Sequence, residues 1–151
     1  MNMNGSTLEY ILQKDSKCGP MFLGVFASDC LPTNFDRSRP AIFVCNTDPH
    51  YKPGEHWVVL YVEDSTYGEY FDSFGRPPDA PFRAFLHKHC TRWIFTDRHL
   101  QSVISRFCGH YCIFYCLNRA RDRNINAIVG MLTMDTGLND YLVHRFVCNN
   151  T

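Results

Sequence analysis

The most constraining feature of the chain is the heptapeptide HWVVLYV, residues 56–62. It shows no polar alternation after its histidine, and its β-branched and aromatic side chains favour a strand. Such a strand is typical of the interior of a sheet that is covered on both faces. The turn-forming residues DSTYG follow, and then EYFDSF over residues 69–74, which together predict an antiparallel hairpin. We therefore expect a central sheet with further elements packed on it.

The rest of the chain mixes short helices and strands. Residues 6–14 are expected to form a helix, with Ser6 as its N-cap and Glu9 three residues later. Residues 21–40 are expected to be mixed, with Pro32 and Pro40 marking irregular chain. Further strands are expected over residues 41–45 and 92–96, and further helices over 81–90, 108–121, 124–132 and 137–147. The pattern predicts a single α+β domain, residues 1–151, with a central, mostly antiparallel sheet and helices packed on it.

Charge and composition exclude several classes of protein. The formal net charge is zero, which gives no indication of a nucleic-acid or membrane-surface partner. No stretch reaches the roughly 20 apolar residues of a transmembrane helix. The N-terminal segment MNMNGSTLEYILQKDSK lacks the basic and apolar regions of a signal peptide. The eight cysteines are therefore expected to be mostly free thiols in an intracellular protein that is not secreted.

Three of the cysteines are spaced four residues apart in the apolar stretch FCGHYCIFYC. Cys108 falls where the helical pattern begins, and a thiol at a helix N-terminus is favoured as the nucleophilic thiolate by the helix dipole and the free N–H groups. Cys112 and Cys116 lie one and two turns further along in apolar surroundings, so they are predicted to be core residues. His110 projects from a different part of the helix surface, and we do not expect it to act on Cys108.

A zinc site is the less favoured interpretation of these cysteines. Structural zinc sites usually combine two ligand pairs, each with a short spacing. The remaining cysteines are scattered singly along the chain, at Cys18, Cys30, Cys45, Cys90 and Cys148. We therefore predict no metal site.

A nucleophilic cysteine needs a base, a group that orients the base and a donor for the developing oxyanion. His56 lies at the mouth of the most hydrophobic strand, and the hairpin places Asp72 within a few residues of it across the ladder. Gln101, seven residues before Cys108, carries an amide that can donate to an oxyanion. Taken singly, each residue also has an ordinary structural interpretation, as a strand-end histidine, a turn aspartate and a solvated glutamine.

Taken together, these residues form a family pattern. In the order GEHWVVLYV, EYFDSFG, LQSV and FCGHYC, with CGPMFLG early in the chain, the sequence resembles the adenovirus maturation protease family (adenain), including the proteases of Polinton/Maverick-type transposons. The resemblance covers roughly residues 8–120. It implies a papain-like, adenain-like cysteine protease fold with the nucleophile helix late in the chain. Adenain has Glu in place of Asp72, whereas proteases of ubiquitin-like proteins, which share the fold, have Asp.

The resemblance also implies roles for individual residues. Cys108 would be the nucleophile, His56 the general base and Asp72 the group that orients the base. Gln101 would form the oxyanion hole together with the backbone N–H of Cys108. Trp57 would wall the cleft and favour glycine-containing sites. The implied function is a cysteine endopeptidase that cleaves viral or virus-like, Polinton-type precursor proteins during particle maturation.

Cofactors, partners and location follow from the same resemblance. The chemistry would require no cofactor. Adenain is activated by DNA and by a short viral peptide that is tethered through a cysteine, and Cys90, eleven residues before Gln101, has the spacing of that cysteine. The substrates would be capsid or core precursors. We expect a monomer that acts in the host nucleus or the virus particle, with no membrane partner.

Two other functions remain open at the level of the sequence. A deubiquitinase or deSUMOylase would use the same triad on the C-terminus of a ubiquitin-like protein. A non-enzymatic zinc-binding or interaction module would use the cysteines for metal binding or packing instead of catalysis.

Overall fold

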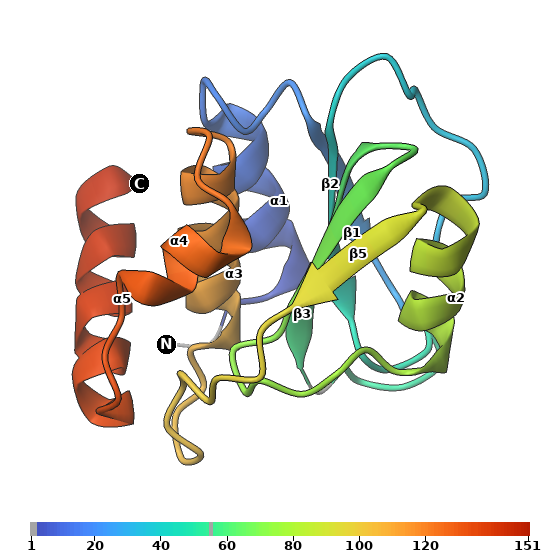
Figure 1. Ribbon diagram of the computed structural model, residues 1–151. Helices are drawn as coiled ribbons and strands as arrows, with labels where there is room; N and C mark the ends of the chain where they lie inside the picture. Colours follow the sequence, from blue (N-terminus) through green and yellow to red (C-terminus); the bar gives the residue numbers. More distant parts are fainter. Residues whose placement is uncertain (1–2, 55) are drawn as a thin grey trace.

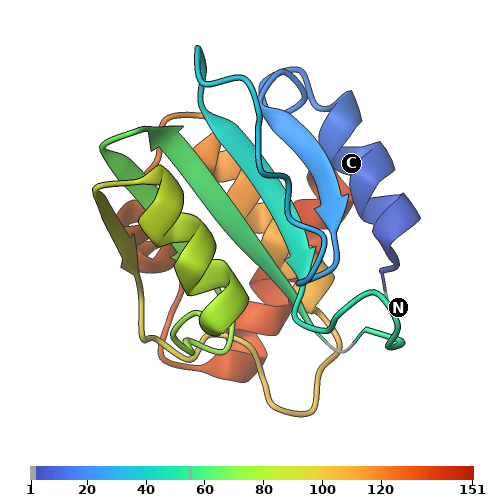
Figure 2. The same cartoon turned by 90° about the vertical axis from the view of Figure 1, so that its right-hand side faces the viewer.

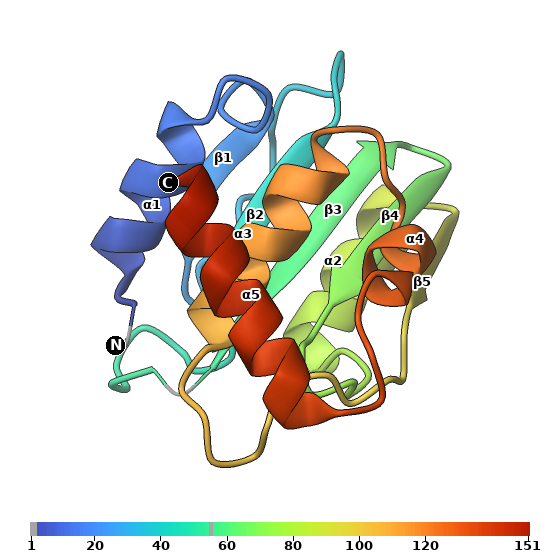
Figure 3. The ribbon, with the colours of Figure 1, turned by 90° about the vertical axis from the view of Figure 1, so that its left-hand side faces the viewer.

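The computed structural model describes residues 3–54 and 56–151 as a five-stranded sheet between two helical layers (Figure 1). Helix α2 covers one face of the sheet (Figure 2), and α1, α3, α4 and α5 lie on the opposite face (Figure 3). The elements are, in chain order, α1 (Gly5–Lys14), β1 (Phe22–Phe26), β2 (Ala41–Asn46), β3 (Trp57–Asp64), β4 (Tyr67–Phe71), α2 (Ala80–His89), β5 (Arg92–Phe95), α3 (Cys108–Arg119), α4 (Ile125–Gly130) and α5 (Thr136–Asn150). None of the helices in the described part of the chain is long and apolar enough to cross a membrane.

The sheet has the strand order β1-β2-β3-β4-β5. Its two central pairings, β2–β3 and β3–β4, are antiparallel, and the predicted hairpin is confirmed. The two outer pairings, β1–β2 and β4–β5, are parallel, so the predicted mostly antiparallel pairing is correct only for the centre of the sheet. Parallel neighbours require a crossover of about a dozen residues or more. The segments 27–40 and 72–91, the second of which contains α2, are long enough to provide these crossovers.

Strand β3 is buried on both faces, as its sequence predicts. Val59 and Tyr61 belong to the larger core, which the sheet forms with α1, α3, α4 and α5. Val58 and Leu60 belong to the smaller core, where Phe82 and its neighbours on α2 cover the other face. Alternate side chains along the strand therefore pack into two separate cores, one on each face of the sheet.

Helix α3 is enclosed along most of its length. Every residue from Gly109 to Asn118 is buried. Cys112 and Cys116 are only 1% and 0% exposed and lie in the larger core, which confirms that they are packing residues. A helix that is apolar all round must be covered on all sides, and here the sheet, α1 and α5 cover it.

Two local predictions are wrong. The N-cap of α1 is Asn4, whose Oδ1 accepts a hydrogen bond from the backbone N–H of Thr7 at 2.9 Å, and not Ser6. The mixed segment 21–40, for which no strand was predicted, contains strand β1. This edge strand is short, its register shifts after Phe22, and Gly24 has a φ of 142°. Such an interrupted strand has a weak sequence signal, and pairing with β2 decides its conformation.

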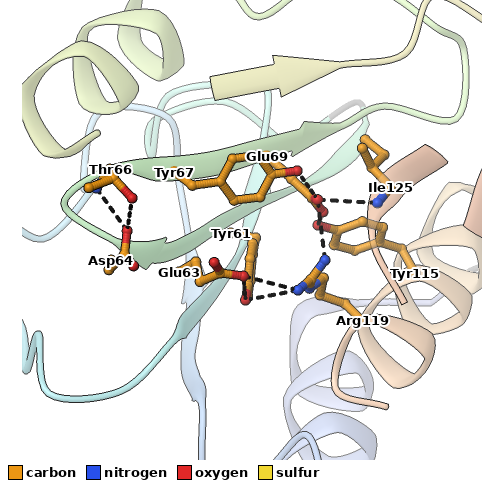
Figure 4. A network of polar contacts seen from close by, with 9 residues as sticks. All are labelled: Tyr61, Glu63, Asp64, Thr66, Tyr67, Glu69, Tyr115, Arg119 and Ile125. Atoms are coloured by element: carbon orange, nitrogen blue, oxygen red, sulfur yellow. Dashed lines mark hydrogen bonds and ion pairs between the residues drawn. The ribbon is translucent and has the colours of Figure 1, made fainter. Parts of the chain in front are cut away.

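A buried carboxylate joins the sheet to the helices above it (Figure 4). Glu69 on β4 is 0% exposed. Its Oε1 accepts a hydrogen bond from the Tyr115 hydroxyl at 2.6 Å. Its Oε2 accepts from Arg119 Nη1 at 3.3 Å, from the backbone N–H of Ile125 at 3.2 Å and from the Tyr67 hydroxyl. One carboxylate thus holds α3 and the start of α4 against β4.

Replacing Glu69 by Ala should lower the free energy of unfolding by about 3–5 kcal/mol, because the mostly buried Arg119 would lose its buried partner. Glu63→Ala is the matched control: Glu63 contacts the same guanidinium at 3.3 Å, but its side chain is 43% exposed. That control should cost about 1 kcal/mol or less. Urea denaturation of both variants provides the measurement, and equal losses would contradict the prediction.

Candidate active site

The candidate site lies at one end of the central hairpin. His56 immediately precedes β3 and Asp72 immediately follows β4, and both side chains are buried. The strand register, in which Val59 faces Phe71, brings these two ends together. His56 Nε2 lies 2.7 Å from Asp72 Oδ1. The structure therefore places the carboxylate beside the imidazole, as expected from the hairpin.

A tight turn after β4 holds Asp72 in position. Its Oδ1 also accepts the backbone N–H of Phe74 at 2.8 Å, and its backbone carbonyl accepts the N–H of Gly75 at 2.8 Å. Gly75 has a φ of 73°, a conformation that favours glycine. The Phe74 ring stacks on His56 with 4.8 Å between the ring centroids. The turn thus positions both the carboxylate and an aromatic surface against the imidazole.

Cys108 is the first residue of α3, is half-buried and lines the same cleft as His56. Because Nε2 of His56 faces Asp72, Nδ1 is the nitrogen left for the thiol. Burial opposes charge on the imidazole, but the hydrogen bonds to Asp72 and Cys108 outweigh it and raise the pKa of His56 to about 9. Burial likewise opposes the thiolate, but hydrogen bonds from His56 and from backbone N–H groups lower the pKa of Cys108. The pair therefore favours a thiolate and an imidazolium near neutral pH.

Gln101 is brought to the same site and is 1% exposed, not solvated. Its Oε1 accepts a hydrogen bond from the Ser73 hydroxyl at 2.6 Å. Its Nε2 lies 3.1 Å from both the backbone carbonyl and the hydroxyl oxygen of Ser105. Neither Ser73 nor Ser105 is predictable from the sequence, since serines in turns are common and give no signal of their own. Together the two serines fix the orientation of the amide.

The reactive groups open onto one cleft of about 780 Å³, which His56, Gln101 and Cys108 line together. Trp57, half-buried, forms part of its wall, where the sequence analysis expected it. Its indole Nε1 donates a hydrogen bond to the backbone carbonyl of Met3 at 3.2 Å. The N-terminal segment before α1 therefore holds the indole against the cleft.

Cys90 and His110 are not among the residues that line this cleft. Cys90 follows α2 and is 6% exposed, with its Sγ only 2.7 Å from the position that a Cβ on Gly68 would occupy. Burial raises the pKa of Cys90 to about 11, so this thiol is poorly placed to form a disulfide with a peptide. His110 packs against the rings of Phe107 and His144, with centroid distances of 4.8 and 5.4 Å.

Comparison with protein-family models finds no match for the chain. Among curated proteins, it is 27% identical over 117 residues to a cysteine protease of African swine fever virus, a match that covers 68% of this chain and 42% of the viral protein. It is 28% identical over 123 residues to the protease of Bovine adenovirus 4, covering 70% of this chain and 60% of that protein. The chain thus spans less than two thirds of either relative. The match to the adenovirus protease agrees with the resemblance seen in the sequence motifs.

Solved structures show the same fold. The crystal structure of the African swine fever virus protease matches with a TM-score of 0.62 at 18% identity, over 95% of this chain and 66% of that chain. The central domain of an uncharacterized protein from Legionella pneumophila matches with a TM-score of 0.55 at 12% identity, over 98% of this chain and 94% of that chain. These likenesses confirm the predicted α+β, adenain-like fold.

Cys108 should still be alkylated at mildly acidic pH, where the exposed Cys30 reacts much more slowly. The lowered pKa of Cys108 keeps its thiolate present as the pH falls, whereas the raised pKa of the exposed Cys30 should make its labelling fall about tenfold per pH unit. His56→Ala should abolish the selective alkylation of Cys108 at mildly acidic pH. Iodoacetamide labelling followed by peptide mapping measures each rate, and the same pH dependence at both cysteines would contradict the prediction.

Proposed function

We propose that this chain is an adenain-like cysteine endopeptidase that cleaves peptide bonds with Cys108, His56 and Asp72. The observation that carries the proposal is the Asp72–His56 hydrogen bond together with a half-buried thiol at the start of a helix, which lines the same open cleft as His56. The two viral relatives, which are both proteases, support the same chemical class.

Acylation would begin at the thiolate of Cys108. Its sulfur attacks the substrate carbonyl carbon, and the carbonyl oxygen takes the negative charge. His56, whose pKa is raised to about 9, carries the proton that the leaving amine needs at neutral pH. Transfer of that proton to the amide nitrogen breaks the C–N bond and leaves a thioester on the sulfur. Asp72 holds the imidazole in the orientation required for this transfer.

Deacylation would use the same groups in reverse. The now neutral His56 accepts a proton from water while the water oxygen attacks the thioester carbonyl. Collapse of the second tetrahedral intermediate breaks the C–S bond, releases the carboxylic acid and restores the thiolate–imidazolium pair. The chain supplies every group in both steps, so the chemistry itself requires no cofactor.

Gln101 is the proposed side-chain donor to the oxyanion, alongside the backbone N–H of Cys108. A side-chain amide carries two N–H hydrogens, and Nε2 has two acceptors on Ser105 at 3.1 Å, so donation to the oxyanion requires one of these two hydrogen bonds to be exchanged for the substrate oxygen in the cleft. The hydrogen bond from Ser73 to Oε1 supports this orientation. Such preorganised donors stabilise the charge that develops in the transition state.

The proposed substrates are precursor proteins of a virus or a virus-like, Polinton-type element, such as capsid or core proteins cleaved during particle maturation. Trp57 beside His56 supports a preference for glycine-containing sites, because an indole in the wall of the cleft leaves little room for bulky side chains. The proposed enzyme acts as a monomer in the host nucleus or the particle. Activation by DNA or by a peptide is a separate proposal, and tethering through Cys90 would first require that thiol to become exposed.

Cys108→Ala should abolish cleavage of a glycine-containing precursor peptide while leaving the circular dichroism spectrum unchanged, because the variant loses only the sulfur that attacks the carbonyl. Cys148→Ala, which removes an exposed thiol on α5, should keep full activity. Cleavage at the parent rate by Cys108→Ala would end the proposal. Faster reaction with a C-terminal electrophile of ubiquitin or SUMO than with the peptide would favour the isopeptidase function instead.

Gln101→Ala should lower kcat by about 10²-fold with little change in KM, since an oxyanion donor acts mainly in the transition state. Gln101→Glu keeps the size of the side chain and the contact with Ser73 but removes the donor, so it should lose activity to a similar or greater extent. Gln13→Ala on the exposed surface of α1 is the control. Thermal melting reports on folding, and a Gln101→Glu variant with parent activity would exclude the oxyanion role.

A further inference from the structure

The loops that follow β1 and β2 are joined to each other beside the cleft. The backbone N–H of Ser28 donates to the carbonyl of Asp48 at 3.0 Å, and the N–H of His50 donates to Asp29 Oδ1 at 2.8 Å. The second loop continues to Pro53 and Gly54, which line the cleft. Movement of this junction would therefore be transmitted to the wall of the proposed active site.

Three potential metal ligands of different chemistry meet at the junction. The carboxylate of Asp29, the thiol of Cys30 and the imidazole of His50 each offer one atom, and these atoms all lie within 4.8 Å of one another. Asp29 Oδ2 is 2.5 Å from His50 Nδ1, and Cys30 Sγ is 3.5 Å from Asp29 Oδ1. All three side chains are exposed. Within residues 3–54 and 56–151, no other group of three such side chains is this close.

The ligand set suits Zn²⁺, which binds thiolate sulfur at about 2.3 Å and imidazole nitrogen or carboxylate oxygen at about 2.0–2.2 Å. In a tetrahedral site these bond lengths place ligand atoms roughly 3.3–3.7 Å apart. The 3.5 Å between Cys30 Sγ and Asp29 Oδ1 falls in this range. The 2.5 Å between Asp29 Oδ2 and His50 Nδ1 is shorter, so these two exposed side chains would have to rotate apart by about 1 Å to admit the ion. Three protein ligands leave a fourth position for water.

We propose that Asp29, Cys30 and His50 bind one Zn²⁺ ion that crosslinks the two loops. On binding, the Cys30 thiol releases its proton to solvent. The N–H of His50 Nδ1, which donates to Asp29, also loses its proton, the neutral ring keeps a proton on Nε2, and the freed Nδ1 lone pair binds the metal. The site is distinct from the proposed catalytic groups, and its ligands are not among the residues that line the cleft. Its role would be to stiffen the loop that leads into His56.

An ordinary surface ion pair would account for the contact between Asp29 and His50, but it would not need a thiol beside it. A second cysteine–histidine pair provides a comparison. On α5, Cys148 Sγ lies 3.9 Å from His144 Nε2, both residues are exposed, and no third ligand joins them among the described residues. Cys148 therefore serves as a matched control for a thiol beside an imidazole without the carboxylate.

The test is a Co²⁺ titration of the Cys108→Ala protein, in which the thiol at the cleft cannot contribute. A thiolate-to-cobalt charge-transfer absorption that saturates at one equivalent and is displaced by Zn²⁺ is the expected result. Adding Cys30→Ser should abolish the absorption. Adding His50→Ala should weaken binding at least tenfold, since even changes behind the ligands cost about 10–100-fold. Adding Cys148→Ser should leave both the absorption and the affinity for Co²⁺ unchanged.

Thermal melting gives a second readout that is independent of catalysis. Zn²⁺ should raise Tm of the Cys108→Ala protein, because it binds the folded state, and it should not raise Tm once Cys30→Ser is added. Absence of the cobalt absorption, or its loss on Cys148→Ser in place of Cys30→Ser, would overturn the proposal. Equally weak binding by every variant would mean an adventitious ion only and would overturn it as well. Since the ligands are exposed, the variants should fold normally.

Discussion

The buried contact between Glu69 and helix α3 is the interaction on which the position of the candidate site depends. Close packing positions the enclosed helix, and hydrogen bonds to a buried carboxylate add a directional constraint that any shift along the helix axis would break. Glu69 supplies that constraint, because it accepts hydrogen bonds from Tyr115 and Arg119 on the helix. Cys108 lies seven residues before Tyr115, roughly 10 Å along the axis at ~1.5 Å per residue. The thiol therefore reaches the end of the hairpin, where His56 is placed.

The candidate site lies at the N-terminal end of α3. There, a row of neighbouring polar side chains keeps the buried imidazole and thiolate in their charged forms. The turn after β4 fixes Asp72 through the backbone N–H of Phe74, Asp72 holds His56, and His56 lines the cleft together with Cys108. Burial alone would suppress the charge on both the imidazole and the thiolate. Each group instead stabilises the charged form of the next, which is the condition for a nucleophilic thiolate near neutral pH. The proposed zinc site acts on the same region from outside, through the loop that precedes His56.

The sequence predicted most elements because their signals are local. The unbroken apolar run of β3 indicated a strand covered on both faces, and the position of Cys108 at the start of an apolar helix separated it from Cys112 and Cys116. Predictions failed where local preference is weak. Strand β1 is an interrupted edge strand that pairing with β2 stabilises. The parallel direction of the outer strands depends on how long connections cross the molecule, which no local pattern records.

The sequence by itself determined the types of residue available for catalysis and the two elements that carry them, a doubly buried hairpin and an apolar helix with a cysteine at its start. Both follow from periodicity and from the chemistry of single side chains. Only the tertiary structure decided which groups meet. The pairing of Gln101 with Ser73 and Ser105, the burial of Cys90 and the convergence of Asp29, Cys30 and His50 join segments that are distant in the chain. Such contacts depend on the packing of whole elements against one another, which the order of residues within any one segment does not reveal.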